Sequence, residues 1–303
     1  MNYQSVLDDI TAAIAPLLGT EGTVASYIPA LARVPARQFG MALRTCDGLE
    51  AAAGDCAVPF SIQSVAKLFS LTLALRQVDD TLWQRIGREP SGNPFNSLVQ
   101  LETEHGVPRN PFINAGAIAV ADRLLSESLG KHDVLALASS LCGETLHFDA
   151  EVAASEAATG FRNVALANFM KSFGKLDNPV ADVLDLYFHQ CAIAMNCQQL
   201  ARAAAYLCRD GAHPLGGDAV IGERHARRIN ALMLTCGTYD AAGEFAFCVG
   251  LPCKSGVGGA IVAVVPDTLA LCVWSPALDA TGNSALGRRA LEMFTARTGL
   301  SIF

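Results

Sequence analysis

The sequence predicts an α+β fold in which both ends of the chain build one antiparallel sheet, flanked by helices, around an inserted all-helical domain. Two patterns support this prediction. Residues alternate with a period of two near 39–54 and again within 246–275, whereas 97–235 places apolar residues at helical spacing. Because 51% of the 303 residues are hydrophobic, the chain is able to bury a sizeable core.

The N-terminal part predicts one amphipathic helix followed by a hairpin. Residues 4–18 place their apolar side chains on one helical face, and Gly19 then ends the helix. The stretch 39–46 alternates like a strand and stops at Asp47-Gly48, a dipeptide typical of tight hairpin turns. A second strand is therefore expected at 49–54.

The remaining elements follow from the same patterns. A helix is expected from the Ser64 region to about Val78, and a passage rich in glycine, proline and asparagine at 87–96 predicts a surface loop. Helices are predicted at 117–129, 132–142, 163–173, 180–196, 197–210, 222–234 and 284–298, and strands at 246–250, 257–265 and 268–275. We expect a sheet domain (1–75 plus 236–303), a helical domain (76–235) and an active site between them.

Composition and charge argue against several classes of protein. The net charge of −7 and the scattered arginines are atypical of nucleic-acid binding. No export signal or membrane span is recognisable, so we expect a soluble, cytoplasmic protein. The ten cysteines contain no Cys-x-x-Cys pair and the six histidines show no metal-binding spacing, which predicts a reducing compartment and no metal site.

Ser64 and Lys67 are the first candidates for catalytic chemistry. A helix beginning near Pro59 would bring both side chains onto one face, as a nucleophile and its base require. A Ser-x-x-Lys pair is expected by chance roughly 0.3 times in a chain of this composition, so the pair alone is weak. The alternative is that Ser64 merely caps a helix.

The triplet Lys254-Ser255-Gly256 strengthens the catalytic interpretation, because it stands directly before the predicted strand 257–265. Serine hydrolases of the penicillin-recognising type combine Ser-x-x-Lys with a similar triplet on a strand beside the site. The alternative is a glycine-rich approach to a strand with an exposed lysine.

If the two motifs converge, burial of Lys67 and the charge of Lys254 would both lower the pKa of Lys67 toward that of an efficient base. The backbone N–H groups of Ser64 and Val257 would then form an oxyanion hole.

Longer motifs extend over most of the chain. They are Pro-Phe-Ser-Ile-Gln-Ser-Val-Ala-Lys (59–67), Gly-Arg-Glu-Pro-Ser-Gly-Asn-Pro-Phe-Asn-Ser (87–97), Pro-Arg-Asn-Pro-Phe-Ile-Asn-Ala-Gly-Ala-Ile (108–118), Ser-Glu (155–156), Arg-Asn (162–163), Tyr-Phe-His-Gln-Cys (187–191), Cys-Gly-Thr-Tyr-Asp-Ala-Ala-Gly-Glu-Phe-Ala (236–246) and Lys-Ser-Gly-Val-Gly-Gly (254–259). With these motifs the chain resembles the serine-dependent glutaminase family, and its bacterial members in particular.

The resemblance implies a fold similar to that of β-lactamases and the hydrolysis of L-glutamine to L-glutamate and ammonia, with no metal or organic cofactor. It assigns Ser64 as nucleophile, Lys67 as general base and Tyr239 as a proton relay to the leaving nitrogen. It places substrate contacts on Tyr27, Gln63, Ser64, Asn114, Glu156, Asn163, Tyr187, Tyr239 and Val257, with Lys254, Ser255 and Gly256 in support. It also implies a homo-oligomer, either a dimer or a tetramer, while charge and hydropathy predict no nucleic-acid or membrane partner.

Simpler interpretations remain open for single residues. Asn114 and Asn163 are typical helix caps, Tyr187 is typical of a core aromatic, and Glu156 is typical of a solvated charge. Thr238 stands where the family often has methionine, which bears on how Tyr239 is held. For the protein as a whole, the alternatives are another amidase or esterase of the Ser-x-x-Lys class and a non-catalytic sensor of glutamine or glutamate.

Overall fold

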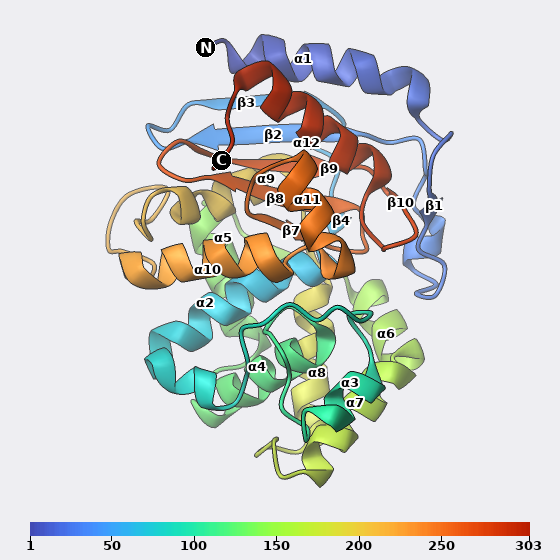
Figure 1. The fold of residues 1–303 in the computed structure, drawn as a ribbon, viewed down its shortest axis with the longest axis vertical. Coiled ribbons are helices and arrows are strands. Elements are labelled where there is room, and N and C mark those ends of the chain that lie inside the picture. The colour runs from blue at the N-terminus through green and yellow to red at the C-terminus, as the bar shows by residue number, and fades with distance from the viewer.

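The computed structural model describes residues 1–303 and shows a sheet layer stacked on a helical block (Figure 1). The main sheet has five antiparallel strands in the order β3-β2-β9-β8-β7. β2 (Gly40–Thr45) and β3 (Glu50–Gly54) come from the N-terminal part of the chain, and β7 (Cys253–Ser255), β8 (Ala260–Val265) and β9 (Leu269–Trp274) from the C-terminal part. The predicted antiparallel sheet built from both chain ends is confirmed.

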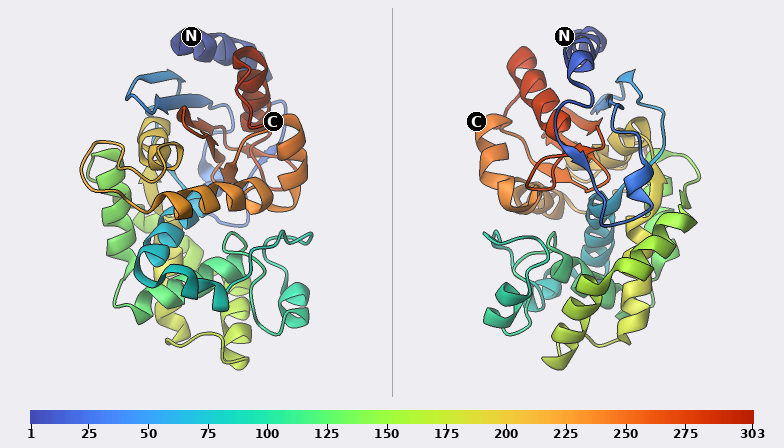
Figure 2. Two further views of the ribbon diagram at one scale, coloured as in Figure 1. Left: turned by 60° about the vertical axis from the view of Figure 1, so that its left-hand side comes forward. Right: turned by 90° about the vertical axis from the view of Figure 1, so that its right-hand side faces the viewer.

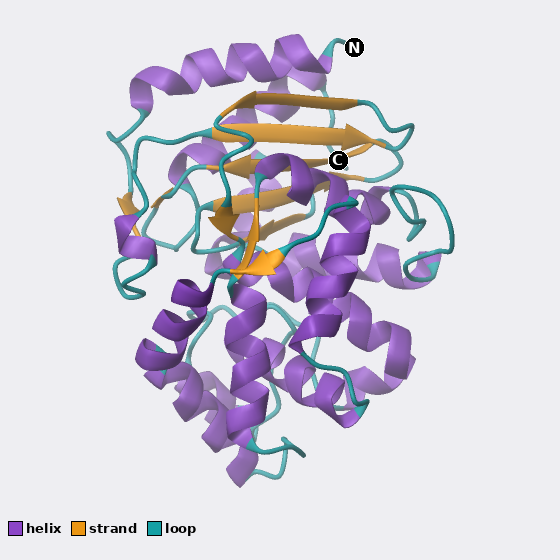
Figure 3. Ribbon diagram, turned by 180° about the vertical axis from the view of Figure 1, so that it is seen from behind, coloured by secondary structure: helices purple, strands orange, loops and turns teal.

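The central strands of this sheet are buried on both faces. On β8, Ile261 lies in the apolar cluster beneath α1 (Tyr3–Ile14) and α12 (Ala285–Thr298), whereas its neighbour Val262 lies in the cluster of the helical block. Seen from behind, α1 crosses above the orange strands near the N-terminus, and the C-terminus lies at the same end of the molecule (Figure 3). Burial on both faces explains why β8 and β9 are almost entirely apolar.

The helical block lies below the sheet in every view (Figure 2). Its helices, with α11 beside the sheet, are α2 (Lys67–Val78), α3 (Leu98–Thr103), α4 (Asn114–Ser126), α5 (Lys131–Cys142), α6 (Ala150–Thr159), α7 (Phe161–Ser172), α8 (Val180–Cys191), α9 (Cys197–Ala204), α10 (Glu223–Cys236) and α11 (Ala242–Cys248). Helix α4 contacts α2, α7 and α8 and so lies near the centre of the block. None of the helices has the length and apolar character needed to cross a bilayer.

One predicted helix of the helical block is shorter in the structure. The predicted helix 180–196 ends at Cys191, and β6 (Ile193–Met195) follows it. β6 pairs with β4 (Phe60–Ser61) and β5 (His147–Phe148) in a small three-stranded sheet. Periodicity could not show this pairing, because its strands are far apart in sequence.

The predicted strand at 246–250 is wrong, because residues 242–248 form helix α11. Its buried residues Ala242 and Phe245, with Val249 beyond its end, follow helical spacing, and Phe247 is 88% exposed. The predicted strand 257–265 is also shorter than expected. Lys254 and Ser255 lie on their own strand, β7, and the chain turns through 256–259 before β8 begins.

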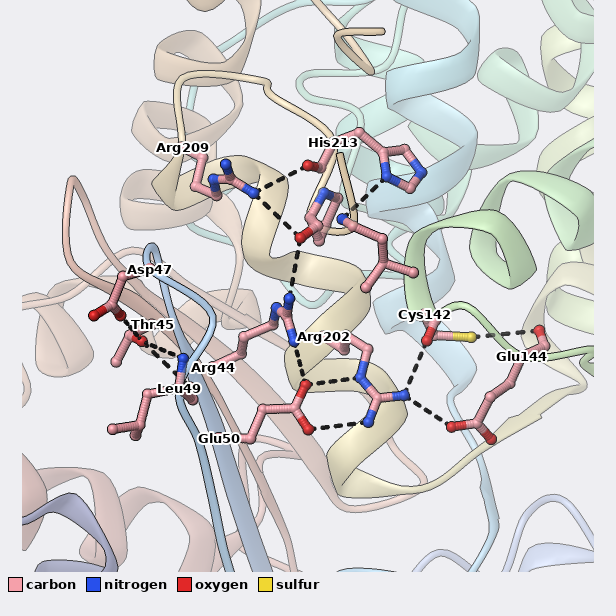
Figure 4. Close-up of polar contacts among 12 residues, drawn as sticks. Arg44, Thr45, Asp47, Leu49, Glu50, Cys142, Glu144, Arg202, Arg209 and His213 are labelled. Atoms are coloured by element: carbon pink, nitrogen blue, oxygen red, sulfur yellow. Dashed lines mark hydrogen bonds and ion pairs between the residues drawn. The ribbon is translucent and has the colours of Figure 1, made fainter. Parts of the chain in front are cut away.

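Arg202 on α9 ties the edge of the sheet to the helical block (Figure 4). Its Nε and Nη2 donate to the carboxylate of Glu50 on β3 at 2.8 and 3.0 Å, and its Nη1 donates to Glu144 at 2.8 Å. α9 also packs against β2 and β9. The division into residues 1–75 plus 236–303 and 76–235 stays a prediction.

The edge beside the main sheet carries one further pair of short strands. β1 (Thr23–Val24) pairs with β10 (Ala277–Leu278), which brings the segment before Tyr27 next to the turn that precedes α12. The predicted N-terminal hairpin, the α2 terminus at Val78 and the α12 stop at Gly299 are confirmed.

Candidate active site

Ser64 lies on a short 3-10 helix, η3 (Gln63–Ala66), that continues directly into α2. A 3-10 turn contains three residues, so the side chains of Ser64 and Lys67 project from the same side. Ser64 lies inside η3, and no side chain caps η3 or α2, so the alternative of a simple capping serine is wrong. Gln63 adopts a φ of +50°, a strained conformation for a residue with a side chain.

Lys67 is buried, with 1% of its surface exposed, and has no carboxylate partner within ion-pair distance. Its Nζ lies 3.0 Å from the carbonyl oxygen of Phe112 and 2.9 Å from Oδ1 of Asn114. Burial lowers the pKa of Lys67 to about 8, against the opposing effect of Glu156. A neutral amine has two N–H donors and one lone pair. These two acceptors therefore satisfy the neutral form and leave its lone pair free.

Lys254 is also fully buried, so the alternative of an exposed lysine is wrong. Its Nζ donates to the carbonyl oxygens of Gly237 at 3.0 Å and Ser255 at 2.5 Å. Burial, together with the charge of Lys67, holds the pKa of Lys254 well below its ordinary value. Burial is the main cause of the lowered pKa of Lys67, as expected, and the charge interaction between the two lysines lowers the pKa of Lys254.

The turn after β7 lies directly against η3. A Cβ atom on Gly256 would lie 2.7 Å from the carbonyl oxygen of Ile62 and 3.2 Å from the backbone nitrogen of Ser64. The backbone N–H groups of Ser64 and Val257 make no hydrogen bond within the fold. Two backbone donors are thus left for an oxygen atom at the serine, as an oxyanion hole requires.

Asn114 and Asn163 form an ordered chain of side-chain amides. Asn114 presents Oδ1 to Lys67, so its Nδ2 faces Asn163 and donates to Oδ1 there at 2.9 Å. Asn163 must then keep its own Nδ2 donors for other partners. Neither side chain caps its helix, so that alternative is wrong for both residues.

Glu156 on α6 is 5% exposed, so the alternative of a solvated charge is wrong. Burial raises the pKa of Glu156 to about 7, while Gln63 and Lys67 oppose this effect. The carboxylate therefore changes its charge near neutral pH.

Tyr239 begins the 3-10 helix η6 (Tyr239–Ala241) and has a φ of +60°. Its hydroxyl lies 3.5 Å from the carbonyl oxygen of Ser255, and its ring centroid lies 4.5 Å from that of Phe95. Burial raises the pKa of Tyr239, although its contacts with Ser64 and Ser255 act in the opposite direction. Its phenol is therefore held neutral beside the serine and is able to pass on a proton.

One pocket brings most of the predicted residues together. Its walls include the predicted residues Tyr27, Gln63, Ser64, Asn114, Glu156, Asn163, Tyr187 and Val257. Lys67, Tyr239 and Lys254 lie behind this wall. Lys67 contacts Asn114, Tyr239 contacts Ser64, and Lys254 contacts Ser255. Tyr187 is 3% exposed, and burial raises the pKa of its phenol well above the ordinary value.

Several other residues that line this pocket were not predicted from the sequence: Ile28, Phe95, Asn96, Thr159, Gly160, Arg162 and Cys191. A signal existed for Cys191, which lies one helical turn after Tyr187 on α8 and so shares its face. Phe95 and Asn96 belong to the predicted surface loop 87–96. Composition predicts that such a loop is exposed, but it does not show which cavity the loop borders.

A second group of titratable residues lies away from this pocket. Asp79, Asp80 and His225 bring their ligand atoms within 4.8 Å of one another, a spacing that a metal ion could use. Arg224 and Arg228 lie within 3.3 Å of these two carboxylates and balance their charge. The group is therefore better described as a surface ion-pair network at the end of α2.

The stacked sheet and helical block, with Ser64 on η3 where the two meet, define a mixed α+β protein with a β-lactamase-like fold. The sequence model of the glutaminase family ("Glutaminase") matches residues 22–303, and the chain belongs to this family.

Individual relatives agree with this assignment. A glutaminase of Methylobacterium sp. (strain 4-46) is 60% identical over 288 residues, which cover 93% of each chain. A glutaminase of Methylorubrum extorquens is 57% identical over 100% of this chain and 99% of its own. A solved Bacillus subtilis glutaminase is similar with a TM-score of 0.88 and 32% identity, and 100% of each chain is covered. That structure is a covalent complex with 5-oxo-L-norleucine, formed by reaction with 6-diazo-5-oxo-L-norleucine.

Proposed function

We propose that this protein is a glutaminase that hydrolyses L-glutamine to L-glutamate and ammonia, with Ser64 as the nucleophile. The observation that carries the proposal is the environment of Lys67, a buried lysine with two oxygen acceptors and no carboxylate partner. At neutral pH, removing a proton from a lysine with a pKa near 8 costs about 1.4 kcal/mol, compared with about 5 kcal/mol at its ordinary pKa. Lys67 is therefore suited to act as the general base.

The pocket wall suits the two ends of a free amino acid. The carboxylate of Glu156 is a partner for the α-ammonium group, and the Nδ2 donors of Asn163 are partners for the α-carboxylate. Tyr27, Gln63 and Tyr187 complete the wall around the substrate chain. A glutamine held at both of these groups would present its side-chain carboxamide to Ser64.

In the first half of the reaction, the Ser64 hydroxyl gives its proton to Lys67 as the oxygen attacks the carboxamide carbon. The N–H groups of Ser64 and Val257 stabilise the oxyanion that forms. The C–N bond then breaks as the leaving nitrogen accepts the proton from Lys67 through the Tyr239 hydroxyl. Ammonia leaves, and a γ-glutamyl ester of Ser64 remains.

In the second half, water replaces ammonia. Lys67 accepts a proton from the water as its oxygen attacks the ester, and the same two N–H groups stabilise the oxyanion. The bond to Ser64 Oγ breaks, the oxygen regains a proton, and glutamate is released. No group other than these side chains and water is needed to balance the two steps.

The covalently modified Bacillus subtilis relative supports this assignment. The reagent 6-diazo-5-oxo-L-norleucine has the carbon chain of glutamine with a diazoketone in place of the carboxamide. A protein that it modifies holds a nucleophile beside the position that the carboxamide group of glutamine would occupy. In the present chain we assign that nucleophile as Ser64.

Ammonia release from glutamine, measured for the wild type and two serine variants, tests the proposal. Ser64→Ala should lose turnover by about 10⁴-fold or more, since nucleophile and base act as a unit, and should still bind glutamate. Ser70→Ala is the matched control, because Ser70 is a buried serine on α2 outside the pocket. A wild type that binds glutamate but releases no ammonia between about pH 6 and 10 would instead be a sensor.

We further infer a homo-oligomer in a reducing compartment, with the pocket between the domains 1–75 plus 236–303 and 76–235. Exposed apolar side chains on α7, among them Phe161 at 77%, support an interface between subunits. All ten cysteines carry free thiols, which supports the cytoplasm. Light scattering of the purified protein and of Phe161→Ser measures the subunit assembly.

A further inference from the structure

We propose that Asn283 is a positioning residue that sets the backbone of Tyr239 and thereby aims the phenol at Ser64. This inference rests on the proposed role of Tyr239 as proton relay. Asn283 belongs to none of the motifs that pointed to the active site, and it lies outside the pocket wall.

The backbone of Tyr239 needs such support. Its φ of +60° lies in the left-handed region, where the Cβ atom of any residue other than glycine meets the neighbouring carbonyl oxygen. Strained backbone of this kind persists only where the surrounding structure holds it in place, and it concentrates at functional sites.

Asn283 supplies this restraint directly. Its Nδ2 donates to the carbonyl oxygen of Thr238 at 3.1 Å. That carbonyl and the N–H of Tyr239 lie in one rigid peptide plane, and φ of Tyr239 is the rotation about the N–Cα bond that joins this plane to the rest of the residue. Fixing the carbonyl therefore fixes one side of that rotation. Asn283 therefore contacts Thr238 through its main chain, whereas the hydroxyl of Thr238 has no hydrogen-bond partner.

Asn283 is itself held by a compact polar turn. It is 0% exposed, and its backbone N–H donates to Oδ1 of Asp279 at 3.1 Å. The same Oδ1 accepts hydrogen bonds from the N–H and hydroxyl of Thr281, and the Thr281 oxygen accepts from Nδ2 of Asn283 at 2.8 Å. The turn thus directs an amide donor from the start of α12 toward η6.

The ring of Tyr239 packs against the ring of Phe95, with the two centroids 4.5 Å apart. Gly282 has a φ of +86°, and a Cβ atom there would lie 3.8 Å from the Tyr239 ring and 3.9 Å from the ring of Phe95. Nζ of Lys254 lies 5.0 Å from the Tyr239 ring centroid. If the plane before Tyr239 is released, its φ can relax to negative values, and the Cα–Cβ bond then turns the phenol away from Ser64.

A double-mutant cycle with Tyr239→Phe distinguishes this role from a general structural one. We expect Asn283→Ala to lower kcat for glutamine by about 10- to 100-fold and to leave the Kd for glutamate within about twofold. In the Tyr239→Phe background, which has already lost the phenol, the same change should have little further effect on kcat. Thr281→Val, which removes one partner of Asn283, should show a smaller loss of the same kind.

Asn230→Ala is the matched control, because Asn230 is also buried and also donates its Nδ2 to a backbone carbonyl, that of Leu207, at 2.9 Å. It should lower the melting temperature without changing kcat. If Asn283→Ala lowers kcat equally in both Tyr239 backgrounds, or raises the Kd for glutamate in parallel, the positioning role is overturned. A full rate for Tyr239→Phe would instead remove the proposed role of Tyr239, and a wild type without glutaminase activity would remove the proposed function.

Discussion

Nζ of Lys67 lies 2.9 Å from Oδ1 of Asn114, and this contact connects the proposed base to the amide of Asn163 in the pocket wall. The lysine fixes which end of the Asn114 amide faces Asn163. The amine of Lys67 therefore determines that Asn163 keeps its Nδ2 donors for the site that we assign to the α-carboxylate.

This contact predicts that Asn114→Asp will shift activity to alkaline pH. A carboxylate beside Lys67 favours the charged amine and should raise its pKa by about 1–3 units. Ammonia release at about pH 7.5 should fall by roughly 10- to 100-fold and recover in part toward pH 10. Asn114→Ala adds no charge, so it should slow the enzyme without this alkaline shift. An unchanged pH profile for Asn114→Asp would contradict the role of Lys67 as base.

The wild-type pH profile follows from two ionisations. Lys67 has a depressed pKa of about 8, so its neutral form is populated above that pH, and Glu156 has a raised pKa of about 7, so its charged form is populated above that value. Neutral Lys67 and charged Glu156 both become more populated as pH rises, so kcat/KM should rise between about pH 6 and 9. In Glu156→Gln the lower ionisation should disappear while the upper one remains. A wild-type profile that falls over this range would contradict both assignments.

Glu156 should also limit the stability of the fold. Its folded-state pKa is raised from 4.5 to about 7, so the folded state favours the protonated form, and stability is lost as pH rises through this interval. Glu156→Gln should therefore increase the free energy of unfolding at about pH 8 by roughly 1–3 kcal/mol and have little effect near pH 4. Denaturant unfolding at both pH values measures this difference, and an equal effect at both values would exclude a charge-based cause.

Gly256 should be intolerant of even one methyl group. A Cβ atom there would lie 2.7 Å from the carbonyl oxygen of Ile62, so η3 and the turn after β7 must separate. This movement displaces the donors of Ser64 and Val257, and loss of one such donor typically costs about 10²–10³-fold in kcat. We expect Gly256→Ala to show this loss in ammonia release. Gly243→Ala on α11 meets no atom within 4 Å and should retain normal activity, so equal rates for both variants would contradict the proposed oxyanion hole.

Arg202 should stabilise the fold without affecting the chemistry. Arg202→Ala removes the bidentate partner of Glu50, whose side chain is 35% exposed and keeps its ion pair with Arg44, so it should lower the free energy of unfolding by about 0.5–1.5 kcal/mol at neutral pH. Arg202 holds the pKa of Glu50 below its ordinary value, so this contribution exists above the unfolded-state pKa and is lost as pH falls through the folded-state value.

Arg33→Ala, which removes a pair with Glu151 whose side chains are both more than 60% exposed, is the matched control for Arg202. It should change stability by less than about 0.5 kcal/mol. The difference between wild type and Arg202→Ala should also close in acid. A loss as small as that of Arg33→Ala would show that the bidentate contact contributes little.

Much of the fold could be predicted from local patterns. The hairpin at Asp47-Gly48 and the C-terminal helix with Ser284 as N-cap and left-handed Gly299 as C-cap depend on residues close in sequence. The strand predicted at 246–250 failed because five alternating residues are too few to distinguish a strand from one face of a short helix.

The candidate site could be predicted mainly where it is compact in sequence. Ser64 and Lys67 lie one turn apart, so their common side follows from local geometry, and the family resemblance supplied the distant members. Phe95, Arg162 and Cys191 were missed as pocket residues because their place in the wall depends on how separate segments pack.

The sequence by itself determined the periodicities, the helix ends and the pairing of a serine with a lysine, since each depends on neighbours within a few residues. Only the tertiary structure decided that Lys254 is buried rather than exposed, that burial lowers the pKa of Lys67, and that Asn283 holds the backbone of Tyr239. The physical reason is that burial and hydrogen-bond partners are set by segments far apart in the chain, which come together only when the sheet closes over the helical block.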